Sequence, residues 1–163
     1  MNKKQVFILL SLLVILIPLT IIFRPKQKQY SPKLQRGDPI LSRELTRKDL
    51  QKIELSKLKE KTLIEKNENA YLVTSREGFA TDPHIMQYFF ENMNKLKVIQ
   101  VIPGGHKELS RFQLDDKGLK LKLHYQDSSS EELILGKPYT RDNKAVGRYI
   151  YLPKVQEVLV VNK

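Results

Sequence analysis

The first strong hydropathy feature of the chain is an uncharged apolar run near its start. Residues 6–23 contain fifteen Val, Ile, Leu or Phe and are interrupted only by Ser11, Pro18 and Thr20. As a helix, this run would span about 27 Å, close to the ~30 Å hydrocarbon core of a bilayer. Its apolar residues contribute on the order of −4 to −9 kcal/mol to insertion. The pattern therefore predicts a transmembrane anchor at 6–23 after a short flank at 1–5.

A cleaved signal peptide is the alternative interpretation of this run. Signal peptides usually have an apolar region of about 7–15 residues, followed by small residues at the cleavage site. The run here is longer, and Arg24-Pro25-Lys26-Gln27-Lys28 comes directly after it. We therefore expect an uncleaved, single-pass anchor in contact with the lipid bilayer.

A basic, proline-containing segment follows the anchor. Residues 24–48 lack apolar periodicity, and this composition predicts an extended linker. A basic side chain beside anionic headgroups contributes about 1 kcal/mol. The candidates for such a weak lipid contact are Arg24, Lys26, Lys28, Lys33 and Arg36.

The charges around the anchor leave its orientation open. Lys3 and Lys4 precede the run and five cations follow it, so positive-inside counting places the following domain in the cytoplasm. Long domains, however, translocate largely regardless of charge. We expect an extracytoplasmic domain and keep the cytoplasmic orientation as the alternative.

The pattern changes at residue 49 to short runs of branched and aromatic residues. Residues 49–56, 61–66 and 70–75 predict an antiparallel meander. Asp82 and Pro83 then provide a helix N-cap and first-turn residue. The apolar positions that follow have helical spacing, and we expect them to face a sheet: Ile85, Met86, Phe89, Phe90, Met93 and Leu96.

The second half of the chain predicts mostly strands. Residues 119–125 alternate apolar and polar positions, as a strand with one solvated face does. Further strands are predicted at 98–102, 131–136, 146–152 and 157–161, with a helical turn at 108–112. The fold class is therefore α+β, an antiparallel-rich sheet with one principal helix, in a single globular domain at 49–163.

Composition and motifs exclude most kinds of active site. The 163 residues include no cysteine, which excludes thiol catalysis and zinc-thiolate sites. His84, His106 and His124 are far apart in sequence and fall in three different predicted elements, so we expect no metal or other cofactor. The net charge of +11 is concentrated before residue 50, which does not favour nucleic acid as a partner.

Short motifs in a fixed order resemble the bacterial domain-of-unknown-function family 4340. They are Lys52-Ile53-Glu54-Leu55, Leu63-Ile64-Glu65-Lys66, Tyr71-Leu72-Val73, Thr81-Asp82, Asn94-Lys95-Leu96, Phe112-Gln113-Leu114, Leu133-Ile134-Leu135-Gly136 and Arg148-Tyr149-Ile150-Tyr151. Tyr71 stands where the family usually has tryptophan, and Gln113 where it favours glycine. The resemblance implies a membrane-anchored envelope protein of the kind encoded beside ABC-type, gliding-motility-associated transporters, and it implies no catalytic residue.

Three functions remain as hypotheses. The first is a non-enzymatic binding or accessory domain at the bacterial inner membrane that docks another envelope protein through an exposed strand edge near either end of the sheet. The alternative is a small-ligand or lipid-binding module with a pocket between helix and sheet, beneath Phe89, Phe90 and Met93. The third, an enzyme, would need His106, Lys107 and an acid in one cleft.

Overall fold

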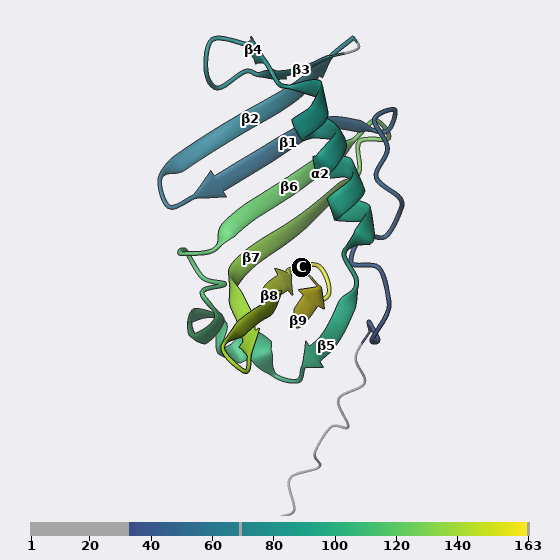
Figure 1. Cartoon of the computed structure of the whole chain (residues 1–163). Helices are drawn as coiled ribbons and strands as arrows, with labels where there is room; N and C mark the ends of the chain where they lie inside the picture. The colour runs from purple at the N-terminus through teal and green to yellow at the C-terminus, as the bar shows by residue number, and fades with distance from the viewer. Residues whose placement is uncertain (1–32, 69, 163) are drawn as a thin grey trace, which may run out of the picture. The chain divides into compact units, whose positions relative to one another are not determined.

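The computed structural model describes residues 33–68 and 70–162 (Figure 1). Its strands and helices are β1 (Leu50–Lys57), β2 (Glu60–Asn67), β3 (Ala70–Val73), β4 (Phe79–Ala80), α2 (Pro83–Lys95), β5 (Val98–Ile102), η1 (Gly105–Lys107), η2 (Leu109–Phe112), β6 (Leu119–Tyr125), β7 (Ser130–Arg141), β8 (Lys144–Leu152) and β9 (Glu157–Asn162). The predicted anchor at 6–23 and the cations Arg24, Lys26 and Lys28 lie outside the described residues. Within the described part, no helix has the length and apolar character needed to cross a bilayer.

The strands form one sheet in which every neighbouring pair is antiparallel. The order is β4-β3-β2-β1-β6-β7-β8-β9-β5. Only the step from β1 to β6 and the placement of β5 beside β9 join strands that are not consecutive in sequence. The described residues therefore have the predicted α+β fold.

The helix α2 begins where the sequence predicts. The Asp82 carboxylate accepts a hydrogen bond from the His84 amide at 2.8 Å, and Pro83 occupies the first turn. Met86, Phe90 and Met93 are buried, because spacings of four and three residues keep them on one face of the helix. Ile85, predicted to face the sheet, is instead 65% exposed, since it lies at the border of that face.

The main core fills the space between α2 and one face of the sheet (Figure 1). The predicted alternation of β6 is confirmed: Leu121, Leu123 and Tyr125 are at most 3% exposed, while the intervening residues are half-buried. The Tyr71 ring packs against Phe90 with centroids 6.0 Å apart. Burial raises the pKa of the Tyr71 hydroxyl to about 12, and this hydroxyl donates to the Leu50 carbonyl at 3.0 Å.

A smaller core forms on the opposite face of the sheet. Phe112 and Leu114 cover Ile134 of β7 and Val158 of β9. Between them, Gln113 adopts a left-handed conformation, with φ 57° and ψ 40°, and its amide donates to the carbonyls of Leu109 and Ser110, the first two residues of η2. The turn keeps a backbone geometry that glycine adopts more readily than glutamine.

The hairpin of β7 and β8 is longer than the sequence predicts. Strand β7 continues to Arg141, beyond the predicted end at Gly136. Pro138 interrupts the apolar pattern, but the strand accommodates it at a register shift between Leu135 and Pro138. Asp142 and Asn143 close the hairpin with positive φ angles of 51° and 59°.

The prediction of an extended linker up to residue 48 is wrong for its described part. Ile40, Leu41 and Leu45 are 6%, 6% and 2% exposed and belong to the main core. Backbone hydrogen bonds join the Gly37 amide to the Val98 carbonyl at 2.8 Å and the Ile40 amide to the Leu96 carbonyl at 3.4 Å. This segment docks through single side chains without regular secondary structure, so it has no apolar period to detect.

Candidate functional site: a pocket beneath the N-terminal strap

Residues 33–45, hereafter the strap, cross the domain before β1 and are held at several points. The Asn94 side chain of α2 binds both backbone groups of Leu45: its Oδ1 accepts from the amide at 2.7 Å and its Nδ2 donates to the carbonyl at 2.9 Å. At the other end of the strap, the Lys33 amide donates to Glu157 Oε1 at 2.6 Å. The strap is therefore tied to elements far away in sequence.

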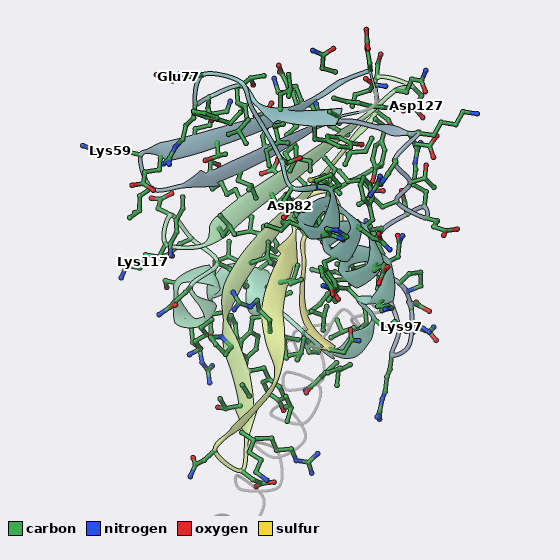
Figure 2. All side chains as sticks on the ribbon, turned by 45° about the horizontal axis from the view of Figure 1, so that its top comes forward. Lys59, Glu77, Asp82, Lys97, Lys117 and Asp127 are labelled. Carbon is green, nitrogen blue, oxygen red and sulfur yellow. The ribbon has the colours of Figure 1, made fainter. Side chains whose placement is uncertain are left out.

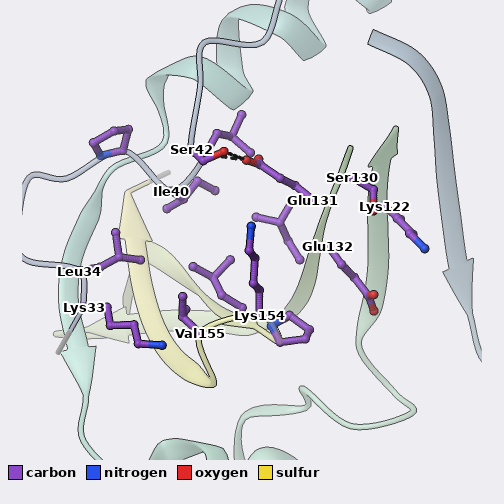
Figure 3. Close-up of a pocket in the computed structure, with 15 residues that line it drawn as sticks. Lys33, Leu34, Ile40, Ser42, Lys122, Ser130, Glu131, Glu132, Lys154 and Val155 are labelled. Carbon is purple, nitrogen blue, oxygen red and sulfur yellow. Dashed lines mark hydrogen bonds between the residues drawn. The ribbon is translucent and has the colours of Figure 1, made fainter. Parts of the chain in front are cut away.

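The middle of the strap is clamped to the start of β7 and the turn before it. The Ser42 amide donates to Glu131 Oε1 at 3.0 Å, and the Ser42 hydroxyl donates to the same oxygen (Figure 3). Arg43 pairs with Asp127 at 2.8 Å and stacks over the Tyr125 ring, 4.5 Å from its centroid. These contacts fix the strap to the turn between β6 and β7 and to the first residues of β7.

The contacts between the strap and β7 shift the pKa values of two titratable groups. Hydrogen bonds from Ser129 and Arg43 lower the pKa of the Asp127 carboxyl to about 2. Burial, with the neighbouring Glu131 carboxylate, raises the pKa of the Tyr125 hydroxyl, which donates to Glu131 Oε2 at 3.1 Å. Both carboxylate oxygens of Glu131 therefore already accept hydrogen bonds from the protein.

Beneath the strap lies a pocket of about 630 Å³, hereafter the strap pocket (Figure 3). Its wall comes from the strap, from the start of β7 with Lys122 of β6, and from the turn between β8 and β9. The apolar side chains that line it are Leu34, Ile40, Leu41, Leu133, Leu152 and Val155. This volume falls within the range of about 300–1,000 Å³ typical of ligand sites.

Charged groups surround the apolar lining of the pocket. Lys33, Lys154 and Glu131 are among the lining residues, and Figure 3 shows the Lys154 side chain extending into the space between the walls. Lys122 and Glu132 also line the pocket, but they are neighbours across β6 and β7 and their side chains point to the face of the sheet opposite Leu133. Among the described residues, no ion pair engages any of these three lysines. Lys33 and Lys154 are therefore available to an anionic group on a ligand in the pocket.

Glu157 lies beside the strap pocket without lining it. It is 3% exposed, and it neighbours Leu152 across the β8–β9 ladder. One carboxylate oxygen accepts from the Lys33 amide, and the other has no hydrogen-bond partner within the described part of the chain. This carboxylate therefore anchors the first described turn of the strap.

The pocket does not lie where the ligand-binding hypothesis places it. Phe90 and Met93 are each 7% exposed and packed in the main core, and α2 contributes no residue to the strap pocket. Met93 and Asn94 instead border a separate pocket of about 440 Å³ with residues 39 and 41–44 of the strap. The space thus lies under the strap rather than between helix and sheet.

The predicted lipid-contact residues within the described part have different surroundings. Lys33 stands at the rim of the strap pocket, whereas Arg36 is exposed on the strap and does not line the pocket. Sequence reasoning missed the pocket-lining residues of the strap. The adjacent Ile40 and Leu41 in a polar segment were the available signal, but one apolar pair has no periodicity.

The histidines do not gather into a site. His84 is exposed on α2, and His106 is half-buried on η1. His124 Nε2 lies 3.0 Å from Glu54 Oε1. Among residues 33–68 and 70–162, no three His, Asp or Glu side chains form a group that could hold a metal ion.

Cross-strand ion pairs occupy the solvated face of β1, β2 and β6. Lys61 lies 3.0 Å from Glu54, and Lys52 lies 2.9 Å from Glu65. The hydrogen bond from Lys61 is the main cause that lowers the pKa of the Glu54 carboxyl. Because these charged side chains pair with one another, their role is to stabilise the sheet, by a few tenths to about 1 kcal/mol per pair.

Comparison with known proteins adds no relative to this description. No protein-family profile, no curated protein and no solved structure matches the chain.

Proposed function

We propose that this chain is a single-pass, membrane-anchored binding protein of the bacterial inner membrane. The anchor is the apolar segment 6–23, and the folded domain is extracytoplasmic. The domain recognises another envelope component without catalysing a reaction, and the resemblance of its sequence motifs favours a component of an ABC-type transport system. The binding site is the strap pocket.

One observation carries the binding role: an apolar pocket of about 630 Å³ opens beneath the strap of a domain whose two cores are packed. A concave lining of six apolar side chains with a few charged groups at its border is the usual composition of a ligand site. The same lining, with lysines at its rim, also fits an amphipathic anion. A lipid-binding module is therefore the second candidate function.

Photo-crosslinking in native membranes tests the proposal. A photoreactive residue replaces Val155, which lines the pocket, in the full chain. The matched control carries the same residue at Glu77, which projects from the turn between β3 and β4 (Figure 2). We expect a discrete adduct from position 155 that position 77 does not give, in membranes that retain the chain after washing.

The adduct distinguishes the two candidate functions by its mass. A protein adduct supports the docking role, and an adduct of lipid mass supports the lipid-binding module. Equal labelling from both positions, or recovery of the chain in the soluble fraction with its amino end removed, contradicts the proposal. Protease digestion of the domain in intact spheroplasts, with protection in sealed inverted vesicles, is expected for the extracytoplasmic orientation.

A further inference from the structure

The strand β7 is paired on one side only at its beginning. Residues Ser130–Leu133 all have partners in β6, from His124 back to Leu121. The ladder with β8 starts only at Ile134, opposite Tyr151. Within the described residues, β8 therefore leaves a gap beside Ser130–Leu133, hereafter the notch, and the strap pocket opens over it.

The backbone of Glu132 faces this notch. The Tyr125 amide donates to the Ser129 carbonyl at 2.9 Å, so in the alternating antiparallel pattern Glu131 and Leu133 direct their backbone groups toward β6. Glu132, between them, directs its amide and carbonyl toward the missing partner strand. No backbone hydrogen bond to Glu132 on the notch side occurs among the described residues.

Proline keeps the notch open. The register of β7 and β8 would bring Pro153 opposite Glu132, two positions beyond the last paired residues, Ile134 and Tyr151. Proline has no amide hydrogen and cannot donate to the Glu132 carbonyl. The chain itself therefore ends the ladder here, and both residues line the strap pocket.

The two walls of the notch suit an extended chain. Successive side chains of a strand point to opposite faces, so a segment paired with Glu132 would direct alternate side chains toward Leu41, Leu133 and Leu152 under the strap. A lipid chain could fill the same apolar space, but it has no peptide groups to pair with the exposed strand edge. The backbone edge therefore favours a polypeptide.

The charges around the notch are complementary to a carboxylate. Lys33 and Lys154 have no ion pair within the described chain, whereas both oxygens of Glu131 are engaged by Ser42 and Tyr125. The Glu132 side chain lies next to Lys122 on the other face of the sheet, and the buried Glu157 carboxylate lies beside the pocket without lining it. A segment with an acidic side chain or a free C-terminal carboxylate would pair with the Lys33 and Lys154 ammonium groups, which no carboxylate of the described chain engages.

We infer that the strap pocket binds an extended segment of a partner protein by strand addition to Glu132. The segment is apolar on the face toward the strap and carries a carboxylate near Lys33 and Lys154. This inference rests on the proposed binding function and names the partner class for the same site. Main-chain hydrogen bonds supply the pairing, and the pocket selects the side chains.

The test measures the yield of the protein adduct from position 155 in full chains that carry one further substitution. Glu132→Pro removes the amide that faces the notch and leaves the hydrogen bonds to β6 intact, while Glu132→Ala keeps the amide and removes the charge. We expect the adduct yield to fall about five- to tenfold in Glu132→Pro, the effect of one lost hydrogen bond, and to fall less in Glu132→Ala, which keeps that hydrogen bond.

Charge reversal provides a second, independent measurement. Lys154→Glu is expected to lower the adduct yield about tenfold. Its control, Lys59→Glu, alters a lysine that projects outward from the β1–β2 turn and should leave the yield unchanged (Figure 2). Mass spectrometry of the adduct is expected to map the crosslink to an apolar segment of the partner with an acidic group.

The outcomes separate this inference from the proposed function. Absence of any adduct specific to position 155 contradicts the binding function itself. A specific adduct that persists in folded Glu132→Pro, that falls equally in both Glu132 variants, or that has the mass of a lipid overturns strand addition while the binding site stands. If Glu132→Pro does not resist protease as the parent chain does, Ser130→Pro, whose amide also faces the notch, takes its place.

Discussion

The backbone amide of Ser42 donates to Glu131 Oε1 at 3.0 Å, which joins the strap to β7 across 89 residues of sequence. The other Glu131 oxygen accepts from the Tyr125 hydroxyl at 3.1 Å. A single carboxylate therefore connects the strap, β6 and β7 beside the pocket. Through this carboxylate, the strap is held in place over the pocket.

The first prediction concerns this carboxylate. Glu131→Ala removes the acceptor for Ser42 and Tyr125, and a hydrogen bond to a charged group contributes about 1.5–3 kcal/mol. We expect the free energy of unfolding to fall by about 1–3 kcal/mol and proteolysis within the strap to accelerate, as measured by denaturant titration and limited trypsinolysis.

The neighbouring glutamate is the matched control for that experiment. Glu132 is exposed and points to the other face of the sheet, so Glu132→Ala should change stability by less than about 0.5 kcal/mol. If the two substitutions changed the free energy of unfolding by the same amount, the hydrogen bonds of Glu131 with Ser42 and Tyr125 would add nothing to stability.

The second prediction is a pH dependence of the clamp at Asp127. The Asp127 pKa in the folded chain, about 2, lies below its ordinary value of 3.8, mainly because Ser129 and Arg43 donate to the carboxylate. A lowered folded-state pKa contributes stability that is present above the ordinary pKa and is lost as the pH falls toward the folded-state value. The clamp should therefore remain intact down to about pH 4.

Paired unfolding measurements on the parent chain and Asp127→Asn test this pH dependence. The difference between their free energies of unfolding should be constant from pH 7 to about pH 4 and should shrink between about pH 4 and pH 2. A difference that changes mainly between pH 5 and pH 7 would assign the pH dependence to another group.

The third prediction uses the left-handed conformation of Gln113. A non-glycine residue in this region costs about 1–2 kcal/mol, while glycine adds about 0.4–1 kcal/mol of unfolded-state entropy. Gln113→Gly should therefore stabilise the domain by about 0.5–1 kcal/mol and raise its melting temperature by about 2–5 °C.

A matched alanine variant distinguishes the effect of backbone strain at residue 113 from the effect of losing the glutamine side chain. Gln113→Ala keeps the strained backbone and should leave the melting temperature within about 1 °C of the parent, because residue 113 is exposed. A glycine variant that melts at or below the temperature of the alanine variant would argue against strain in this turn.

Local sequence patterns determined the elements of this domain. The alternation in 119–125 and the Asp82-Pro83 cap correctly predict β6 and α2, because a strand face or a helix cap depends on residues only a few positions apart. The local pattern also predicted that β7 ends at Gly136, because Pro138 interrupts the apolar pattern. The strand continues past Pro138 because the pairing with β8 shifts its register there, and the sequence of β7 alone does not show this shift.

Tertiary structure alone decided the strap, its pocket and the notch. Lys33 meets Glu157 and Ser42 meets Glu131 across 124 and 89 residues, and such contacts have no period that a sequence window can detect. The notch depends on where two ladders end, which is a property of the register between β7 and β8. The sequence by itself determined most of the helix and strand segments, because these depend on neighbouring residues, whereas the candidate site depends on which distant segments pack together.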